Sequence, residues 1–335
     1  MWFPPVRECG PPRSSDWQAM ISPDISIIRA TRDRLRKYFG ATPLKPAPTL
    51  SRVGSELYLK IETGLPTGSF KPRGALCALA TNLARRKIAE VTASSTGNHG
   101  AAVAFAAKTL GVRATIFLPE NANPIKRKKI QDLGARIVET GSADLAEAFE
   151  RAREYSAKDG IYFLNDATDP DLPAGPATIG LEIVEQLSEV HAVFVPMGDT
   201  ALIRGVAAAI KQLAPRVKVI GVQAARAPSY CLSWREGKAV PTESCDTCAD
   251  GLATRTPDAD NVKTIRQLVD DVVLVSEERM VEAIHQLYHQ EGIVAEPAGA
   301  AATAAWLDWQ APSGNVVLLV TGGNIADAVR HRAGI

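Results

Sequence analysis

The first candidate for chemistry in this sequence is a lysine set between small residues. Lys71 lies in the stretch 68–75, Gly-Ser-Phe-Lys-Pro-Arg-Gly-Ala, which joins a strand-like run to an alanine-rich helical run. In α/β proteins, such strand-to-helix junctions are where ligands tend to bind. A lysine held in a cleft there can be kept as a partly desolvated neutral amine, the form that makes Schiff bases. An ordinary lysine at a helix start is exposed, so the neighbours of Lys71 decide its interpretation.

A second candidate is the turn Ser95-Thr96-Gly97-Asn98-His99-Gly100, which follows a strand candidate and precedes another alanine-rich helix. Hydroxyls, an amide and the N–H groups of a helix N-terminus together form a good receptor for a carboxylate. A capped strand-to-helix turn without any ligand has the same residue types. The turn alone therefore leaves both interpretations open.

Two more turns follow strand candidates. In Gly198-Asp199-Thr200-Ala201-Leu202, backbone N–H groups at a helix start could hold a phosphate. Asp199 can equally be a helix N-cap, and its negative charge is unfavourable beside a phosphate. In Thr321-Gly322-Gly323-Asn324, the hydroxyl of Thr321 can donate to or accept from a ring nitrogen, or serve as a plain turn residue.

The elements that must position these residues alternate along the chain. Expected strands cover residues 56–61, 90–94, 114–118, 136–139, 161–164, 192–195, 218–222, 271–275 and 316–320. Expected helices cover residues 25–39, 74–87, 100–110, 124–133, 143–158, 175–187, 201–213, 276–290 and 298–309. Strands that are apolar throughout and alternate with helices imply a largely parallel sheet covered on both faces. The sequence therefore predicts an α/β fold.

The composition excludes several classes of function. A net charge of +1, with 46% hydrophobic and 22% charged residues, gives no electrostatic case for nucleic acid or an anionic membrane as the main partner. The basic run 126–129 is accordingly interpreted as a solvated helix face. No apolar run is long enough to span a bilayer, and the N-terminus lacks the apolar core of a signal peptide.

Cysteines and histidines provide no convincing metal or redox site. The five cysteines are few, odd in number and scattered, which argues against a disulfide framework and favours a reducing, cytoplasmic compartment. Cys245 and Cys248 have CxxC spacing, but no second pair or nearby histidine completes a zinc or redox site. His285 and His289 lie four residues apart on an expected helix, where a solvated face is the more common interpretation than a metal clamp.

Together, the motifs resemble those of the fold type II pyridoxal-phosphate enzymes, specifically the threonine/serine dehydratase and serine racemase group. The match lies in residues 68–75, 95–100 and 294–300, the last of which is Val-Ala-Glu-Pro-Ala-Gly-Ala. Residues 249–253 and 321–324 agree as well, in the order and spacing of the family. The resemblance implies two open, mostly parallel twisted sheets with helices on both faces, and pyridoxal 5′-phosphate as the cofactor.

The resemblance also implies a role for each matched residue. Lys71 would form the Schiff base with the cofactor, and Phe70 would pack beside the cofactor ring. Asn98 would hydrogen-bond the ring 3′-oxygen, Thr321 would face the pyridine nitrogen, and Glu296 would lie near the ring. The family loop that binds the substrate carboxylate corresponds to Ser95, Thr96, Gly97 and His99. The loop that holds the cofactor phosphate corresponds to Gly198, Asp199, Thr200, Ala201 and Leu202.

A division of the chain follows from the same resemblance. Residues 1–20 would form a poorly ordered N-terminal arm. Residues 21–89 and 168–335 would form a large cofactor-binding domain, and residues 90–167 a smaller mobile domain that closes over the substrate. The family suggests a homodimer. The chain ends soon after the catalytic domain, so we expect no C-terminal regulatory domain like that of biosynthetic threonine dehydratases.

Three features depart from the family pattern. Asp199 interrupts the usual run of glycines in the phosphate loop, although Thr200 adds a hydroxyl donor. Thr96 stands where serine racemases have the serine that acts as second acid/base, and its bulkier hydroxyl favours elimination over racemisation. Residues 223–229 lack the acidic side chains with which relatives hold a divalent cation, so we expect no metal there.

The sequence therefore predicts a pyridoxal-phosphate-dependent lyase that eliminates the β-hydroxyl of a hydroxy amino acid, threonine or serine, and yields a 2-oxo acid and ammonia. Lys71, displaced by the substrate, would remove the Cα proton as general base. An amino-acid racemase, or a lyase that eliminates or replaces another β-substituent, is the alternative among enzymes. The alternative of another class is a ligand-binding protein that kept the fold but lost tight cofactor binding, which Asp199 would favour.

Overall fold

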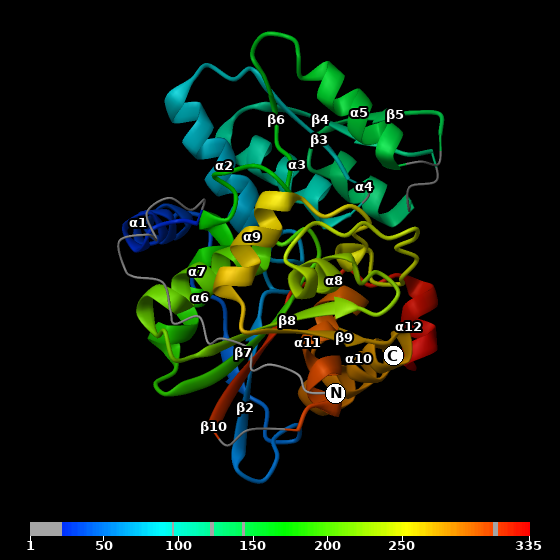
Figure 1. Cartoon of the computed structure of the whole chain (residues 1–335). Helices are drawn as coiled ribbons and strands as arrows, with labels where there is room; N and C mark the ends of the chain where they lie inside the picture. Colours follow the sequence, from blue (N-terminus) through cyan, green and yellow to red (C-terminus); the bar gives the residue numbers. More distant parts are fainter. Residues whose placement is uncertain (1–21, 96, 121–123, 143–144, 311–313) are drawn as a thin grey trace, which may run out of the picture.

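The computed structural model describes residues 22–95, 97–120, 124–142, 145–310 and 314–335 (Figure 1). The predicted N-terminal arm and Thr96 lie outside the described residues. The strands are β1 (Leu44–Pro46), β2 (Ser55–Ile61), β3 (Glu90–Ser94), β4 (Arg113–Leu118), β5 (Arg136–Glu139), β6 (Ile161–Phe163), β7 (Val190–Pro196), β8 (Lys218–Ala224), β9 (Asp271–Val275) and β10 (Gly314–Val320). The helices are α1 (Ile25–Leu35), α2 (Lys71–Arg85), α3 (Asn98–Leu110), α4 (Pro124–Asp132), α5 (Leu145–Tyr155), α6 (Ala174–Gln186), α7 (Ala201–Leu213), α8 (Ser229–Glu236), η2 (Asp250–Leu252), α9 (Ala259–Leu268), α10 (Glu277–Glu291), α11 (Pro297–Asp308) and α12 (Asp327–Ala333).

The described strands form two sheets. The six-stranded sheet has the order β1-β2-β10-β7-β8-β9, and within it β1 runs antiparallel to β2 while the other neighbours are parallel. The four-stranded sheet has the order β5-β4-β3-β6 and is parallel. We call the part from β3 to β6 (90–163) the four-stranded unit and the part built on the other sheet the six-stranded unit. Figure 1 shows the first above the second. Two mostly parallel sheets confirm the predicted α/β fold class.

Helices cover both faces of the six-stranded sheet, and strand β10 shows how. Val316, Leu318 and Val320 belong to the apolar core that β10 shares with α10 and α11. Val317 and Leu319, which point to the opposite face, belong to the core shared with α6, α7 and α9. Strand β10 is therefore buried on both sides, which explains why its sequence is apolar without alternation.

The predicted strands and helices are present, with their ends shifted by a few residues. The helix after the lysine motif begins at Lys71 itself rather than at Gly74. The sequence prediction missed β1, α8, α9 and α12. The sequence signal for the start of α9 is Asp258, because aspartate is a favoured N-cap residue. In the structure its carboxylate accepts hydrogen bonds from the backbone N–H groups of Asp260 and Asn261.

A buried charge cluster fixes the first turn of α2. The guanidinium of Arg73, 1% exposed, donates to Glu62 from Nε (2.8 Å) and to Glu182 from Nη1 (2.7 Å). Lys60 donates to Glu182 at 2.6 Å, so two cations face two carboxylates. Helix α2 also packs against α3 of the four-stranded unit and α6 of the six-stranded unit. The first turn of α2 is thus held where the two units meet.

Candidate functional site

Lys71 is the first residue of α2, and Phe70 is the N-cap. Its Nζ lies 5.4 Å from the centroid of the Phe70 ring. The same atom lies 2.6 Å from Oδ2 of Asp166, which follows β6. The side chains of Lys71 and Asp166 are 20% and 21% exposed. The lysine proposed to form a Schiff base is therefore mostly removed from solvent and paired with a carboxylate.

His99, in the first turn of α3, lies beside this ion pair. Its Nε2 is 2.9 Å from the carbonyl oxygen of Leu164, and because a carbonyl oxygen only accepts, Nε2 carries the hydrogen. Burial lowers the pKa of His99, which favours the neutral ring. Nδ1 lies 3.8 Å from Oδ2 of Asp166. The Nε2–H of His99 is therefore engaged by Leu164 and is not available to a substrate carboxylate.

The turn at the start of α3 offers backbone donors instead. Gly97 is the N-cap of α3, and no side chain of the described residues caps this helix. The N–H of Gly97 itself donates to the hydroxyl of Ser95 (3.2 Å). A Cβ on Gly100 would lie 2.8 Å from the carbonyl oxygen of Ser95, so the turn is too tight for a larger residue there. An uncapped helix N-terminus of this kind can bind a carboxylate.

Asn98 is held by residues from the C-terminal part of the chain. Its Nδ2 donates to Oε1 of Glu296, the N-cap of α11, at 2.6 Å. Its Oδ1 accepts from Nδ2 of Asn324, also at 2.6 Å. The amide of Asn98 and the carboxylate of Glu296 are thus in direct contact although 198 residues separate them in the sequence.

The segment after β10 lies against the segment before α2. The backbone N–H of Phe70 donates to the carbonyl oxygen of Thr321 at 2.9 Å. The hydroxyl of Thr321, 5% exposed, lies 3.4 Å from the carbonyl oxygen of Ala298. A Cβ on Gly322 would lie 2.2 Å from Oε1 of Glu296, so the glycine makes room for that carboxylate. Phe70, Thr321 and Glu296 therefore meet at one place.

Residues 198–202, the predicted phosphate loop, lie between the end of β7 and the first turn of α7. The N-cap is Thr200 and not Asp199, and no described side chain caps the helix. Thr200 has φ +68°, an uncommon conformation for a residue with a side chain. A Cβ on Gly198 would lie 2.1 Å from the carbonyl oxygen of Gly251, so the loop is packed tightly onto residues 250–252. The first N–H groups of α7 form a second anion receptor.

Two side chains near this loop bear on how it could hold an anion, the carboxylate of Asp199 and the guanidinium of Arg204. Its Oδ1 accepts from the hydroxyl of Thr254 at 3.0 Å. Burial, together with the charge of Asp166, raises the pKa of Asp199 to about 6. Arg204, 3% exposed, lies one helical turn into α7 and donates from Nε to Oγ1 of Thr200 at 3.1 Å. Asp199 therefore still carries most of its negative charge near pH 7, and the positive charge of Arg204 is the feature that favours an anion at this loop.

Three side chains of the site were missed by sequence reasoning: Asp166, Arg204 and Lys129. Asp166 had one available signal, since it follows a predicted strand in an α/β sheet. The interpretation of the basic run as a solvated face is wrong for Lys129, which is half-buried and donates to the carbonyl oxygen of Thr67 (2.6 Å) and to Oδ1 of Asn324 (2.7 Å).

The metal and redox candidates remain outside the site. Cys245 and Cys248 are free cysteines. His285 and His289 are exposed, as predicted, and their ring centroids lie 4.3 Å apart. Within the described part of the chain, no group of three or more His, Cys, Asp and Glu side chains could hold a metal ion. No helix in that part is long and apolar enough to cross a membrane.

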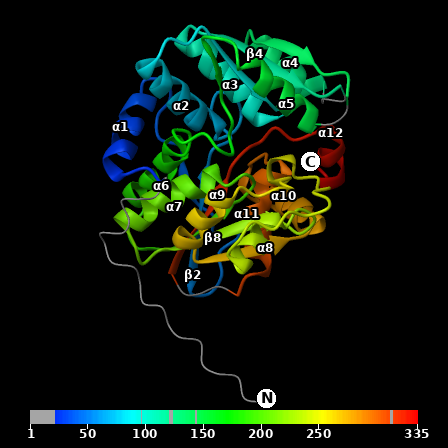
Figure 2. The same cartoon turned by 45° about the horizontal axis from the view of Figure 1, so that its top comes forward.

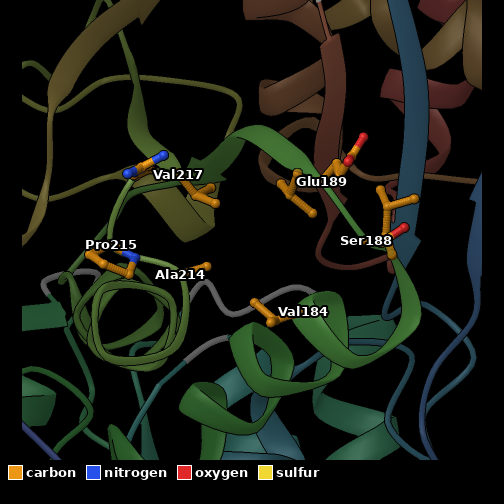
Figure 3. Close-up of a pocket in the computed structure, with 9 residues that line it drawn as sticks. Val184, Ser188, Glu189, Ala214, Pro215 and Val217 are labelled. Carbon is orange, nitrogen blue, oxygen red and sulfur yellow. The ribbon is translucent and has the colours of Figure 1, made fainter.

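A cavity of about 350 Å³ lies away from these residues (Figure 3). Its lining comes from the end of α6 and the start of β7, including Val184 and Glu189, and from Ala214, Pro215 and Val217 between α7 and β8. These are the amino ends of β7 and β8, whereas the site lies where strands end. The cavity therefore belongs to the opposite edge of the six-stranded sheet.

Comparison with known proteins places the chain among enzymes of amino-acid chemistry. It is 40% identical over 300 residues to an L-threonine ammonia-lyase of Thermotoga maritima, which covers 89% of this chain and 75% of that protein. It is 33% identical over 309 residues to a catabolic L-threonine dehydratase of Staphylococcus aureus, with 89% and 88% covered. Among solved structures, the processed threonine deaminase isoform 2 of Solanum lycopersicum has a TM-score of 0.85 at 32% identity, with 94% of each chain covered. Maize serine racemase has a TM-score of 0.87 at 29% identity, covering 93% of this chain and 97% of that one.

The described residues fit pyridoxal phosphate. Lys71 supplies an amine at the junction of the two units, and Asn98 supplies an amide that Glu296 and Asn324 hold in place. The starts of α3 and α7, which no described side chain caps, offer two anion receptors that suit a substrate carboxylate and a cofactor phosphate. The family described as pyridoxal-phosphate dependent enzyme matches residues 35–322. The chain belongs to this family of pyridoxal-phosphate dependent enzymes and, within it, to the lyases related to L-threonine ammonia-lyase.

Proposed function

We propose that this enzyme removes the β-hydroxyl of L-threonine or L-serine and releases a 2-oxo acid and ammonia. The observation that carries the proposal is the ion pair of Lys71 and Asp166 at the start of α2, beside the uncapped start of α3. An amine and an anion receptor are what an α-amino acid requires of a site that forms a covalent bond to its amino group. The relatives named as threonine ammonia-lyases and dehydratases support threonine as the substrate.

In this proposal each group of the cofactor has a partner. Lys71 would hold the cofactor covalently, Phe70 would lie beside the ring, and residues 198–202 would hold the phosphate. Asn98 keeps one N–H beyond the one given to Glu296, and this N–H serves the ring 3′-oxygen. The neutral hydroxyl of Thr321 faces the ring nitrogen. Pyridoxal phosphate held in this way supplies an electron sink for the electrons of the broken Cα–H bond.

Lys71 is the residue that moves the proton. Once the amino group of the substrate has replaced it, Nζ is a free amine that takes the Cα proton and becomes an ammonium. A carboxylate at 2.6 Å, that of Asp166, stabilises this ammonium by a charge-assisted hydrogen bond. The β-hydroxyl then leaves as water with the proton that the Lys71 ammonium gives up, and hydrolysis of the released product gives the 2-oxo acid and ammonia.

We also propose that residues 90–167 move as a small domain against residues 21–89 and 168–335. The start of α3 belongs to the first part and Lys71 to the second. Closure would therefore bring the carboxylate receptor onto the substrate and exclude water from the reacting atoms. A homodimer in the cytoplasm completes the proposal. The compartment is supported by the four described cysteines, all of which are free thiols.

The test uses the purified full chain loaded with pyridoxal phosphate. We expect a yellow protein whose colour borohydride fixes onto Lys71, found by mass spectrometry of the tryptic peptide. We expect 2-oxo acid from L-threonine or L-serine, measured by a coupled assay. Lys71→Ala should lose turnover, whereas Lys108→Ala, at an exposed lysine of α3, should keep it. Elimination by Lys71→Ala at the wild-type rate would contradict the proposal.

The same preparation separates the alternatives. Chiral chromatography of the remaining substrate detects a racemase, an activity named for three of the similar solved structures. If the opposite enantiomer formed faster than the 2-oxo acid, the main activity would be racemisation and not elimination. A colourless protein that gains no absorbance band with pyridoxal phosphate would indicate a ligand-binding protein without tight cofactor binding.

A further inference from the structure

Lys129 reaches from one unit of the molecule to the other. It belongs to α4, which Figure 2 shows with β4, α3 and α5 in the four-stranded unit. Its ammonium donates to the carbonyl oxygen of Thr67 (2.6 Å) and to Oδ1 of Asn324 (2.7 Å), both in the six-stranded unit. Its neighbour Lys128 instead pairs with Asp132 of the same helix at 2.8 Å and is exposed. Lys129 thus differs from Lys128 in both its partners and its exposure.

The contact of Lys129 with Asn324 agrees in direction with every later hydrogen bond and adds to the contacts that fix it. An ammonium only donates, so the atom of Asn324 that faces it must be the amide oxygen. The NH₂ group of Asn324 then points the other way and donates to Thr67 (2.9 Å) and to Oδ1 of Asn98 (2.6 Å). With its oxygen occupied, Asn98 can only present its NH₂ group to Glu296 and to the site.

The series of hydrogen bonds Lys129–Asn324–Asn98–Glu296 therefore begins at a cation and ends at a carboxylate. Each bond in it has only one possible donor and one possible acceptor. Burial lowers the pKa of Lys129, and the charge of Glu296 opposes this effect, so the two ends of the series attract one another. The backbone is adapted to the contact as well. Gly68 has φ +72°, and a Cβ there would lie 2.7 Å from Oδ1 of Asn324.

We propose that Lys129 is a positioning residue that fixes the amide of Asn98 through Asn324, and does so only when α4 is seated on the six-stranded unit. The role rests on the proposed contact of Asn98 with the cofactor. Through Lys129, the packing of the two units affects how the NH₂ group of Asn98 is oriented toward the proposed site of the cofactor ring. With Lys129 removed, the Asn324 amide keeps its contact with Thr67 but loses the one that holds its oxygen, so Asn324 and, through it, Asn98 are held less firmly.

The experiment compares Lys129→Met with Lys128→Met in the full-length holoenzyme. Methionine keeps the length and apolar character of the lysine stem while removing the donors. We expect Lys129→Met to raise the Kd for pyridoxal phosphate and lower kcat/KM, each about 10- to 100-fold, because a charge-assisted hydrogen bond is lost. We also expect its cofactor absorbance band to shift and broaden. Lys128→Met should match the wild type in all three measurements.

A double-mutant cycle tests the route through Asn324. In an Asn324→Ala background, Lys129→Met should cause no further loss, whereas independent effects would add and contradict the proposal. Equal values for Lys129→Met and Lys128→Met in cofactor affinity and spectrum would also overturn it, even with a lowered Tm.

Hydrogen exchange of the cofactor-free protein supplies a measurement that does not depend on the reaction. Lys129→Met should speed exchange at residues 97–101 and 322–325, and unchanged exchange there would contradict the proposal. If the wild type bound no pyridoxal phosphate, the proposed function would fail while this measurement would still decide the role of Lys129.

Discussion

Oδ2 of Asp166 lies 2.6 Å from Nζ of Lys71, and this pair joins the segment after β6 to the first residue of α2. A cation at a helix N-terminus is opposed by the helix dipole. Asp166 compensates for that position by supplying a negative charge. The carboxylate can hold the ammonium formed when Lys71 takes a proton, which makes it part of the proton-transfer machinery in our proposal.

Replacing Asp166 by asparagine should therefore slow the reaction without preventing cofactor binding. Asn keeps the size and a hydrogen-bond acceptor but removes the charge. We expect kcat to fall about 10- to 100-fold, the loss typical of one charge-assisted hydrogen bond at a reacting atom. Solvent deuterium should enter Cα of the substrate more slowly, which NMR measures.

The matched control is Asp171→Asn in the same loop. Asp171 accepts from Arg85 at 2.6 Å rather than from Lys71, so this variant should keep the wild-type kcat. An unchanged kcat for Asp166→Asn, or complete loss of bound cofactor, would show that Asp166 does not act on the proton of Lys71.

Asp199 should make the cofactor-free protein less stable as the pH rises. The pKa of Asp199 is raised from 3.8 to about 6, so the folded state binds the proton more tightly than the unfolded chain. The resulting stabilisation is complete below about pH 4 and is lost as the pH rises through about 6. As the pH rises from 4 to 7, the free energy of unfolding of Asp199→Asn should increase by roughly 2 kcal/mol relative to that of the wild type. Urea unfolding at several pH values measures this difference, and a constant difference would refute the assignment.

Arg204 should strengthen cofactor binding through Thr200. Because Nε of Arg204 only donates, Oγ1 of Thr200 accepts and its own hydrogen remains for a phosphate oxygen. Arg204→Met should raise the Kd for pyridoxal phosphate about 10-fold, measured by absorbance titration. Lys211→Met, later in α7 and paired with Asp270, is the control with unchanged Kd. Equal Kd values of the two variants for pyridoxal phosphate would show that Arg204 does not contribute to phosphate binding.

Arg73 should matter to stability far more than other arginines of α2. Arg73→Met leaves Glu62 and Glu182 buried without their guanidinium partner, a change that typically costs about 3–5 kcal/mol. Arg85→Met, at a side chain 61% exposed, should cost at most about 1 kcal/mol. Denaturant unfolding checks both values. Similar costs for the two variants would mean that the cluster is not what holds the start of α2.

Much of the fold was predictable because apolar strands and alanine-rich helices carry strong local patterns. Strand β9 and helix α7 were predicted with the bounds that the structure has, since each is a continuous pattern between clear breaks. Helix α12 was missed because its seven residues bury only Ala333 and so leave almost no periodic signal. Strand β1 is three residues long and includes a proline, which is atypical of a strand.

The site was predictable only where its residues form local motifs. Lys71, Asn98 and Thr321 lie in such motifs, whereas Asp166 meets Lys71 across 95 residues of sequence. Lys129 meets Asn324 across 195 residues. Contacts of this range depend on how the two units pack, which no pattern within a single segment specifies.

Strand β10 lies between β2 and β7 although it is made long after both. The carbonyl oxygen of Thr321, which directly follows β10, holds the backbone N–H of Phe70 next to Lys71. A ribosome adding about 5–20 residues per second needs on the order of 10 to 50 s to travel from Lys71 to this segment. During that time, Lys71 is part of a nascent chain that still lacks β10 and Thr321. Cofactor capture is therefore a late event in the synthesis of this protein, and a retained cofactor marks a chain whose folding is complete.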